Sequence, residues 1–318
     1  MIIIKFNDDI THTYNSFEEI LKLENYNDII LMNCNNNNLS NLPKLPKSLK
    51  FLYCSYNKLS SFPKLPNSLK HLYCYHNDLS SLPKLPKSLK LLYCHNNYLS
   101  SLPELPNLLK ILYCNGNYLS SLPELPNSLK HLYCYHNDLS SLPKLPKSLK
   151  LLYCHNNYLS SLPELPNLLK ILYCNGNYLS SLPELPNSLI ELYCDNNDLS
   201  NLPELPNSLT HLQCNSNNLS SLPELPNSLK GLKCFDNDLS NLPELPNSLL
   251  KISFNYNPIH TYIKIYFDGK RQQYFDYQRQ MKRGFANKIG NWYLDCKYNP
   301  KYLYCKKRLM KEYDELYN

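Results

Sequence analysis

Apolar and polar positions along this chain follow a pattern that repeats every twenty residues. The unit at 49–68, LKFLYCSYNKLSSFPKLPNS, recurs from residue 29 to residue 259 in twelve copies. Most copies share the frame L-x-x-L-x-C-x-x-N-x-L-x-x-L-P-x-L-P. At the start of each unit the apolar residues alternate with a period of two, which is typical of a strand. The pattern predicts a short strand near 51–54 and at every twentieth residue on either side.

The strand segment predicts which side chains face the core. In the 49–68 unit, Leu52 and Cys54 are expected to point inward, whereas Phe51, Tyr53 and Ser55 are expected to point outward. The repeat therefore predicts an invariant core beneath an outward face whose composition varies.

The remainder of each unit is predicted to be extended. Asn57 stands where the chain turns, and its amide can bond the backbone of its own and neighbouring coils. Pro63 and Pro66 lack N–H donors and bias the residues before them away from helix, so this side is expected to be close to polyproline II. We predict a leucine-rich repeat solenoid with a parallel β-sheet on the concave side, an extended convex side, and helical N- and C-terminal caps.

The two ends of the chain differ from the repeats. Residues 1–28 are predicted to form an N-terminal cap of a short strand plus a helix, because the SFEE sequence at 16–19 fits a capping box. Residues 260–318 are predicted to be a basic, aromatic C-terminal cap or tail. In this tail we expect a strand near 263–267 and a helix after Asn299.

The net charge of +7 lies entirely in the tail. Residues 1–259 contain twenty lysines and twenty acidic residues, whereas residues 260–318 hold thirteen Lys or Arg and six acidic residues. The opening MIIIKFNDDI is too short an apolar run for a signal peptide, and no later stretch is long enough to cross a membrane. We expect a cytoplasmic monomer that is not secreted by a classical signal and does not bind membranes.

Eleven of the thirteen cysteines, Cys34 through Cys234, occupy one repeat position, and the other two, Cys296 and Cys305, lie in the tail. The two-residue alternation of the strands points this cysteine column into the core, and the Cβ vectors of neighbouring cysteines run parallel instead of towards each other. This geometry disfavours disulfides, so we expect free thiols in a reducing compartment. Cys74 with His76 could suggest a metal, but zinc needs about four ligands that converge on one point. We therefore expect no metal and no cofactor.

The LPELP sequence at 102–106 and the twenty-residue period resemble the LPX-type leucine-rich repeats of the YopM and IpaH bacterial effectors over residues 29–259. The Asn-, Ile-, Lys- and Tyr-rich usage looks like that of an AT-rich genome, and the repeats are also similar to leucine-rich repeat proteins of giant amoebal viruses. The chain departs from the effectors in its cysteine column and its tyrosine column. IpaH-like effectors add a C-terminal ubiquitin-ligase domain, for which the 59-residue tail is too short. The resemblance implies the fold and a binding role, in the host cytoplasm if the protein is viral.

An outward column of tyrosines is the strongest candidate for a binding surface. It consists of Tyr53, Tyr73, Tyr93, Tyr113, Tyr133, Tyr153, Tyr173 and Tyr193. Such a column stiffens a sheet by stacking, and tyrosine is also enriched in binding surfaces, so both roles stay open. Variable residues flank it, and the candidate partner-binding set also includes His71, His131, Tyr75 and Tyr135.

These patterns favour a non-enzymatic protein–protein interaction scaffold with an unidentified protein partner, a host protein being one candidate. The sequence has no Gly-rich phosphate loop, nucleophile elbow or paired acids that would assign catalytic residues. One alternative is nucleic-acid binding through the basic tail and the tyrosine stripe, against which the neutral repeat array argues. Another is an adaptor or effector that recruits host enzymes such as the ubiquitin machinery.

Overall fold

The computed structural model of the chain describes residues 1–7, 10–261 and 276. Residues Met1–Pro258 form one compact unit, which is described here. The strand expected near 263–267, the helix expected after Asn299, and the two tail cysteines lie outside the described residues.

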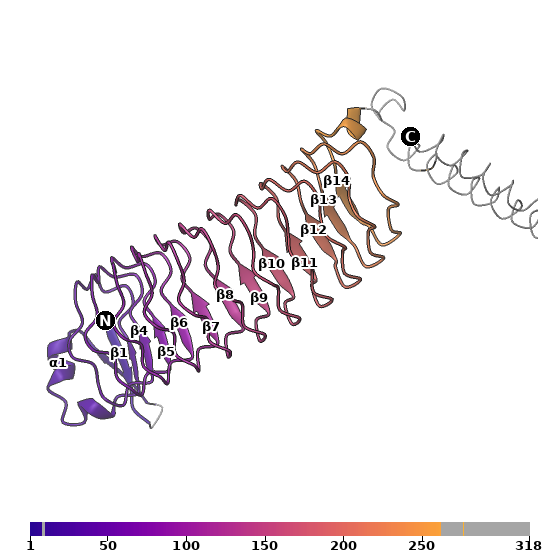
Figure 1. Cartoon of the computed structure of the whole chain (residues 1–318). Helices are drawn as coiled ribbons and strands as arrows, with labels where there is room; N and C mark the ends of the chain where they lie inside the picture. The colour runs from indigo at the N-terminus through magenta and orange to yellow at the C-terminus, as the bar shows by residue number, and fades with distance from the viewer. Residues whose placement is uncertain (8–9, 262–275, 277–318) are drawn as a thin grey trace, which may run out of the picture. The chain divides into compact units, whose positions relative to one another are not determined.

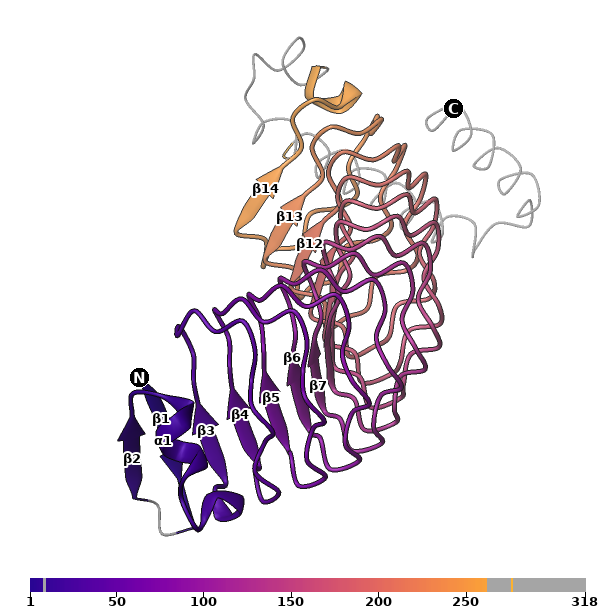
Figure 2. The ribbon, with the colours of Figure 1, turned by 90° about the vertical axis from the view of Figure 1, so that its left-hand side faces the viewer.

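One fourteen-stranded sheet runs through this unit, in the order β14 back to β3 and then β1 and β2 (Figure 1). Its parallel strands each have three residues and recur every twenty: β3 (Leu31–Asn33), β4 (Phe51–Tyr53), β5 (His71–Tyr73), β6 (Leu91–Tyr93), β7 (Ile111–Tyr113), β8 (His131–Tyr133), β9 (Leu151–Tyr153), β10 (Ile171–Tyr173), β11 (Glu191–Tyr193), β12 (His211–Gln213), β13 (Gly231–Lys233) and β14 (Lys251–Ser253). Equivalent residues of successive coils pair, as Tyr53 pairs with Tyr73. The strands line the concave side of the stack, which confirms the predicted leucine-rich repeat solenoid (Figure 2).

The same positions build the core of every coil. In the coil of β4, Leu49, Leu52, Cys54 and Leu59 are all fully buried. Full burial of a leucine stabilises the fold by about 1.5–3 kcal/mol before chain entropy is subtracted. Because each coil buries these side chains against its neighbours, stability belongs to the stack and not to single coils.

An asparagine column satisfies the backbone where each coil turns. The Nδ2 group of Asn57 donates to the carbonyl oxygens of Cys34 and Cys54, both at 3.0 Å. Its Oδ1 accepts the N–H of Leu39 at 3.0 Å. The donor pattern recurs as far as Asn257, which confirms the predicted ladder of satisfied amides.

The residue before each ladder asparagine turns the chain in the left-handed region, with φ values of 55° at Tyr56 and 61° at Gly116. The strand itself ends at Tyr53. Ser55 was expected to point outward, and its side chain is fully buried. The larger residue at the same position of the next coil, Tyr75, is only partly buried and stacks on a neighbouring ring.

Antiparallel strands close the N-terminal end of the stack. β1 (Ile2–Lys5) pairs with β3, and β2 (Thr11–Tyr14) pairs with β1. The second of these strands was not predicted, because its THTY sequence lacks apolar alternation. The short helix α1 (Phe17–Leu21) starts at Ser16, whose hydroxyl oxygen accepts a backbone N–H at 3.4 Å, and a 3-10 turn, η1 (Tyr26–Asp28), follows.

Between β3 and β14, the described outer walls contain neither helix nor strand, as the prolines predict. A serine ladder joins neighbouring walls, since the Ser68 Oγ donates to the Leu49 carbonyl oxygen at 2.8 Å. Leu108 and Leu168 stand at the equivalent of this serine, and each is 51% exposed.

Candidate binding face

The eight candidate tyrosines form one continuous stack on the outward face of β4 to β11. Neighbouring ring centroids lie 3.9–4.7 Å apart, and six of the seven pairs are parallel to within 25°. The exception is Tyr153–Tyr173, whose rings are tilted by 54°. Stacked aromatic pairs contribute about 0.5–1.5 kcal/mol beyond the area that they bury.

Each ring of this stack is partly shielded by its neighbours. Burial raises the pKa of Tyr73, Tyr93 and Tyr113, and nearby tyrosines raise it further. The phenols are therefore neutral at physiological pH and can both donate and accept hydrogen bonds. The stack ends where Gln213 and Lys233 take the tyrosine position.

Histidines flank the stack where the strands begin. His71 and His131 are the first residues of β5 and β8. Burial lowers the pKa of both, and nearby lysines lower it further, Lys90 and Lys70 in the case of His71. The His71 ring also packs edge-on against Phe51 at 4.8 Å. This edge thus presents neutral imidazoles beside charged lysines.

A second set of aromatic pairs flanks the stack where the strands end. Tyr75 stacks on His95 with centroids 4.4 Å apart, and Tyr135 stacks on His155 at 4.3 Å. Burial, and then the charge of His76, lowers the pKa of His95 to about 4, so this imidazole is neutral at physiological pH. Tyr75 and Tyr135 are consequently held in place rather than freely exposed.

A further row of tyrosines was not predicted as a site. Tyr98 and Tyr158 are each 53% exposed, and Tyr118 and Tyr178 are each 58% exposed. The rings form two parallel pairs, with 6.1 Å between centroids in each. The sequence feature that could have indicated these tyrosines is the variable residue directly after each ladder asparagine.

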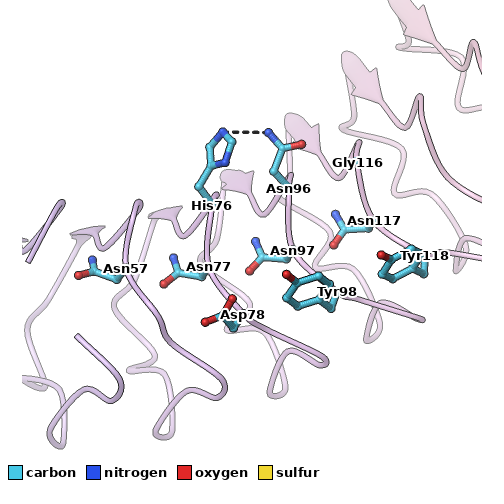
Figure 3. A pocket seen from close by; sticks show the side chains of 10 residues that line it. All are labelled: Asn57, His76, Asn77, Asp78, Asn96, Asn97, Tyr98, Gly116, Asn117 and Tyr118. Carbon is cyan, nitrogen blue, oxygen red and sulfur yellow. Dashed lines mark hydrogen bonds between the residues drawn. The ribbon is translucent and has the colours of Figure 1, made fainter. Parts of the chain in front are cut away.

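The first of these pairs lines a hollow of about 590 Å³ at the edge of the sheet (Figure 3). Tyr98, Tyr118 and Asp78 are on one side of it. The His76 ring and the Asn96 amide are on another side and are joined by a hydrogen bond of 2.9 Å. A second hollow of about 410 Å³ is lined mostly by residues sixty positions further along the chain, but not by the counterparts of His76 and Asp78.

The eleven described cysteines are buried and free. The Cys54 Sγ donates to the Tyr73 carbonyl oxygen at 3.4 Å, and burial raises the pKa of Cys94 to about 12. Protonated thiols of this kind act as small apolar side chains. No group of three or more His, Cys, Asp or Glu side chains could hold a metal ion in the part of the chain that the structure describes.

Comparisons with known proteins agree with this geometry. Residues 47–84 match the family described as Leucine Rich repeats (2 copies). YopM from Yersinia enterocolitica WA-314 is 42% identical in sequence, with a TM-score of 0.67, over 68% of this chain and 48% of that chain. The chain belongs to the leucine-rich repeat family.

Two further solved structures share the fold. The leucine-rich repeat protein LIC12759 of Leptospira interrogans is 26% identical over 71% of this chain and 72% of its own, with a TM-score of 0.56. The leucine-rich repeat part of FLRT2 was solved in an octameric complex with Latrophilin 3 and Unc5D. It is 24% identical over 71% of this chain and 81% of its own, with a TM-score of 0.60. The match to YopM spans about half of that protein's length. No curated protein sequence matches this leucine-rich repeat chain.

Leucine-rich repeat folds are typical of protein–protein interaction scaffolds and effectors, which are generally non-enzymatic. Among the described residues, no helix combines the length and the apolar character needed to span a membrane.

Proposed function

We propose that this leucine-rich repeat protein is a non-enzymatic scaffold that binds a protein partner through its concave tyrosine face. The observation that carries the proposal is the stack of eight half-buried tyrosines on adjacent strands. Tyrosine offers a large contact area for few rotatable bonds. Stacking orders the rings before a partner arrives, so less side-chain entropy is lost on binding.

The dimensions of the face suit a folded protein. The tyrosine-bearing strands β4 to β11 extend over roughly 34 Å at about 4.8 Å per strand. A standard interface buries about 800 Å² on each partner, which corresponds to a patch roughly 28 Å across. The stack alone therefore extends over the length of one such interface.

The flanks of the stack indicate the chemistry of the partner. Seven lysines, Lys50 to Lys170, precede the strands, and neutral imidazoles such as His71 lie directly beside them. A partner with an apolar or aromatic centre and acidic side chains towards the strand starts would match this face. FLRT2 occurs in a complex with other proteins, which supports a protein as the ligand class.

The test is the double variant Tyr113→Ser/Tyr133→Ser, because this pair has the shortest ring separation of the stack, 3.9 Å. Partners are captured by cross-linking to the wild-type chain, and the affinity of each purified candidate is then measured directly. Loss of central tyrosines can remove about 2 kcal/mol or more of binding free energy, which is roughly a thirtyfold increase in Kd. Leu108→Ser/Leu168→Ser is the control on a different surface, because both leucines are 51% exposed on the outer wall and serine stands at their position in the neighbouring coils.

Three results would contradict this assignment. Unchanged partner affinity in a folded Tyr113→Ser/Tyr133→Ser variant, with only a lower Tm, would mean that the stack stiffens the sheet and does not bind. Equal losses in the control variant would show that the effect is not specific to the concave face. Strong salt dependence that disappears on removal of residues 260–318 would favour nucleic-acid binding through the tail.

A further inference from the structure

The residues that directly follow the ladder asparagines form a row along the edge where the strands end. From residue 58 the row reads Lys58, Asp78, Tyr98, Tyr118, Asp138, Tyr158, Tyr178, Asp198, Asn218 and Asp238. Seven consecutive members define the aspartate–tyrosine row: Asp78, Tyr98, Tyr118, Asp138, Tyr158, Tyr178 and Asp198. All seven side chains are exposed.

The two edges of the sheet carry opposite charge. The edge at the strand starts has seven lysines, Lys50 to Lys170. At the strand ends, residues 76–81 and the equivalent six residues of the next six coils contain three aspartates and no lysine or arginine. Lys58 lies one coil before the aspartate–tyrosine row, on the side of its first aspartate. The row therefore has a negative local charge that attracts cationic groups and repels phosphates.

The first hollow places aromatic rings next to one of these carboxylates. The first hollow is lined by Asp78, Tyr98 and Tyr118, and Asp138 follows one coil later. Adjacent coils are about 4.8 Å apart, and a cation is attracted to an aromatic ring within about 6 Å of its centroid. A basic side chain between a tyrosine and the neighbouring aspartate would thus contact both an aromatic ring and a carboxylate.

We propose that the aspartate–tyrosine row is a second binding site, which takes an extended basic peptide segment. Its arginine or lysine side chains enter the two hollows, and its backbone runs across the coils. Arginine suits this site better than lysine, because its planar guanidinium stacks on aromatic rings and pairs with a carboxylate through two donors. This site is separate from the concave tyrosine face, since its rings follow the turn instead of the strand.

The site is duplicated. Tyr158 and Tyr178 line a second hollow of about 410 Å³, and its neighbouring aspartates are Asp138 and Asp198. Three coils separate the two hollows, a distance of about 15 Å. An extended chain covers that distance in about five residues. A peptide with two basic clusters at this spacing can occupy both hollows, and bivalency raises affinity without any new type of contact.

The probe for the test is a fluorescent peptide, Arg-Gly-Arg-Ser-Ser-Arg-Gly-Arg, whose two clusters are centred five residues apart. Its anisotropy is measured with the full chain at low and at physiological salt. Tyr98→Ser/Tyr118→Ser and Tyr158→Ser/Tyr178→Ser should each raise the Kd about tenfold or more, because each leaves one hollow. All four substitutions together should abolish binding. Asp138→Asn should weaken binding by about threefold to tenfold, since its coil lies between those of Tyr118 and Tyr158.

Two controls keep the result specific. Thermal unfolding should change little in the four-tyrosine variant, because all four rings are more than half exposed. Tyr113→Ser/Tyr133→Ser should bind the basic peptide as the wild type does, because those rings belong to the concave face. The two proposed sites can therefore fail independently of each other.

Four outcomes would overturn the proposal. Undiminished peptide binding to the folded four-tyrosine variant would mean that the peptide is held only by diffuse attraction to the charge of the protein surface. Equal binding of the same peptide with glutamate in place of arginine would remove the charge argument. Unchanged affinity of Asp138→Asn would remove the carboxylates from the site. Binding of the neutral oligosaccharide cellohexaose that depends on the tyrosines, without binding of the peptide, would assign the hollows to carbohydrate.

Discussion

Residues 71–129 and 131–189 have identical sequences, so the protein contains the same three coils twice. Most of their geometry is the same. Tyr75 stacks on His95 at 4.4 Å and 8°, and the copied pair stacks at 4.3 Å and 9°. Identical coils therefore reproduce this contact almost unchanged.

The two blocks differ where they meet the next coil. Tyr153 and Tyr173 are tilted by 54°, whereas the copied pair Tyr93–Tyr113 is parallel to within 13°, and both pairs have centroids 4.4 Å apart. The Tyr173 hydroxyl donates to the Glu191 Oε2 at 2.9 Å, whereas a histidine occupies the equivalent position after the first block. In a solenoid, the environment of a side chain is set jointly by its own coil and by the following one.

The largest expected effect tests whether the two cores are equivalent. Leu112→Ala and Leu172→Ala each remove a fully buried side chain from the same position of the two blocks. We expect each to lower the free energy of unfolding by about 2–5 kcal/mol, and by nearly equal amounts. Urea unfolding of the two variants checks this. A clear difference between them would show that the next coil influences the core as well as the surface.

A smaller loss is expected from the left-handed turns. Gly116→Ala would bring a Cβ within 2.2 Å of the Asn96 Oδ1 at a φ of +61°, and Gly176→Ala would meet Asn156 at 2.3 Å. Left-handed backbone costs an alanine about 1–2 kcal/mol, and the close contact adds to that. The control Gly116→Ala/Asn96→Gly removes the contacting oxygen and should recover the added part; glycine is used because Asn96 also has a left-handed φ, of 52°. Thermal melts that show no loss for either glycine variant would contradict the turn geometry.

Acid should destabilise both blocks to a similar extent. The pKa of His95 and of His155 is lowered from 6.5 to about 4, first by burial and then by a neighbouring histidine. A depressed pKa means stability that is present above pH 6.5 and is lost as the pH falls towards 4. Because both rings are partly solvated, we expect about 1 kcal/mol per site. Urea unfolding at pH 7, 5 and 4 should show this loss, and His95→Phe and His155→Phe should each reduce it by a similar amount; the lowered pKa values of His71 and His131 contribute to the remainder.

The smallest effect concerns the hydrogen bond between Tyr173 and Glu191 in the second block. Burial, and then hydrogen bonds with Tyr193 and Glu191, raises the pKa of Tyr173. Glu191→Gln removes the charge and should lower that pKa, with less than about 0.5 kcal/mol change in stability. An absorbance titration of the tyrosines measures the shift. The converse substitution His131→Glu should raise the pKa of Tyr113. An unchanged tyrosine pKa in both variants would show that this hydrogen bond does not form and does not explain the tilt.

The amino-acid sequence by itself determined the solenoid, its register and its core. Leu52, Cys54 and Asn57 recur in phase along the repeat array, and a twenty-residue coil has few ways to bury such a frame. The inward cysteines and the amide ladder followed from strand parity and hydrogen-bond satisfaction, and both are confirmed. The tyrosine column could also be placed on one face, because its position lies within the strand.

Only the tertiary structure decided what happens beyond Cys54, where the chain leaves the strand. Strand parity does not extend through a left-handed turn, so the burial of Ser55 and the exposure of Tyr98 could not be derived from alternation. The tilted Tyr173 donates to a glutamate that the next coil supplies, whereas its own twenty residues are identical to those of an untilted copy. Periodicity determines the direction of side chains within regular elements, whereas turns and contacts between coils depend on how those elements stack.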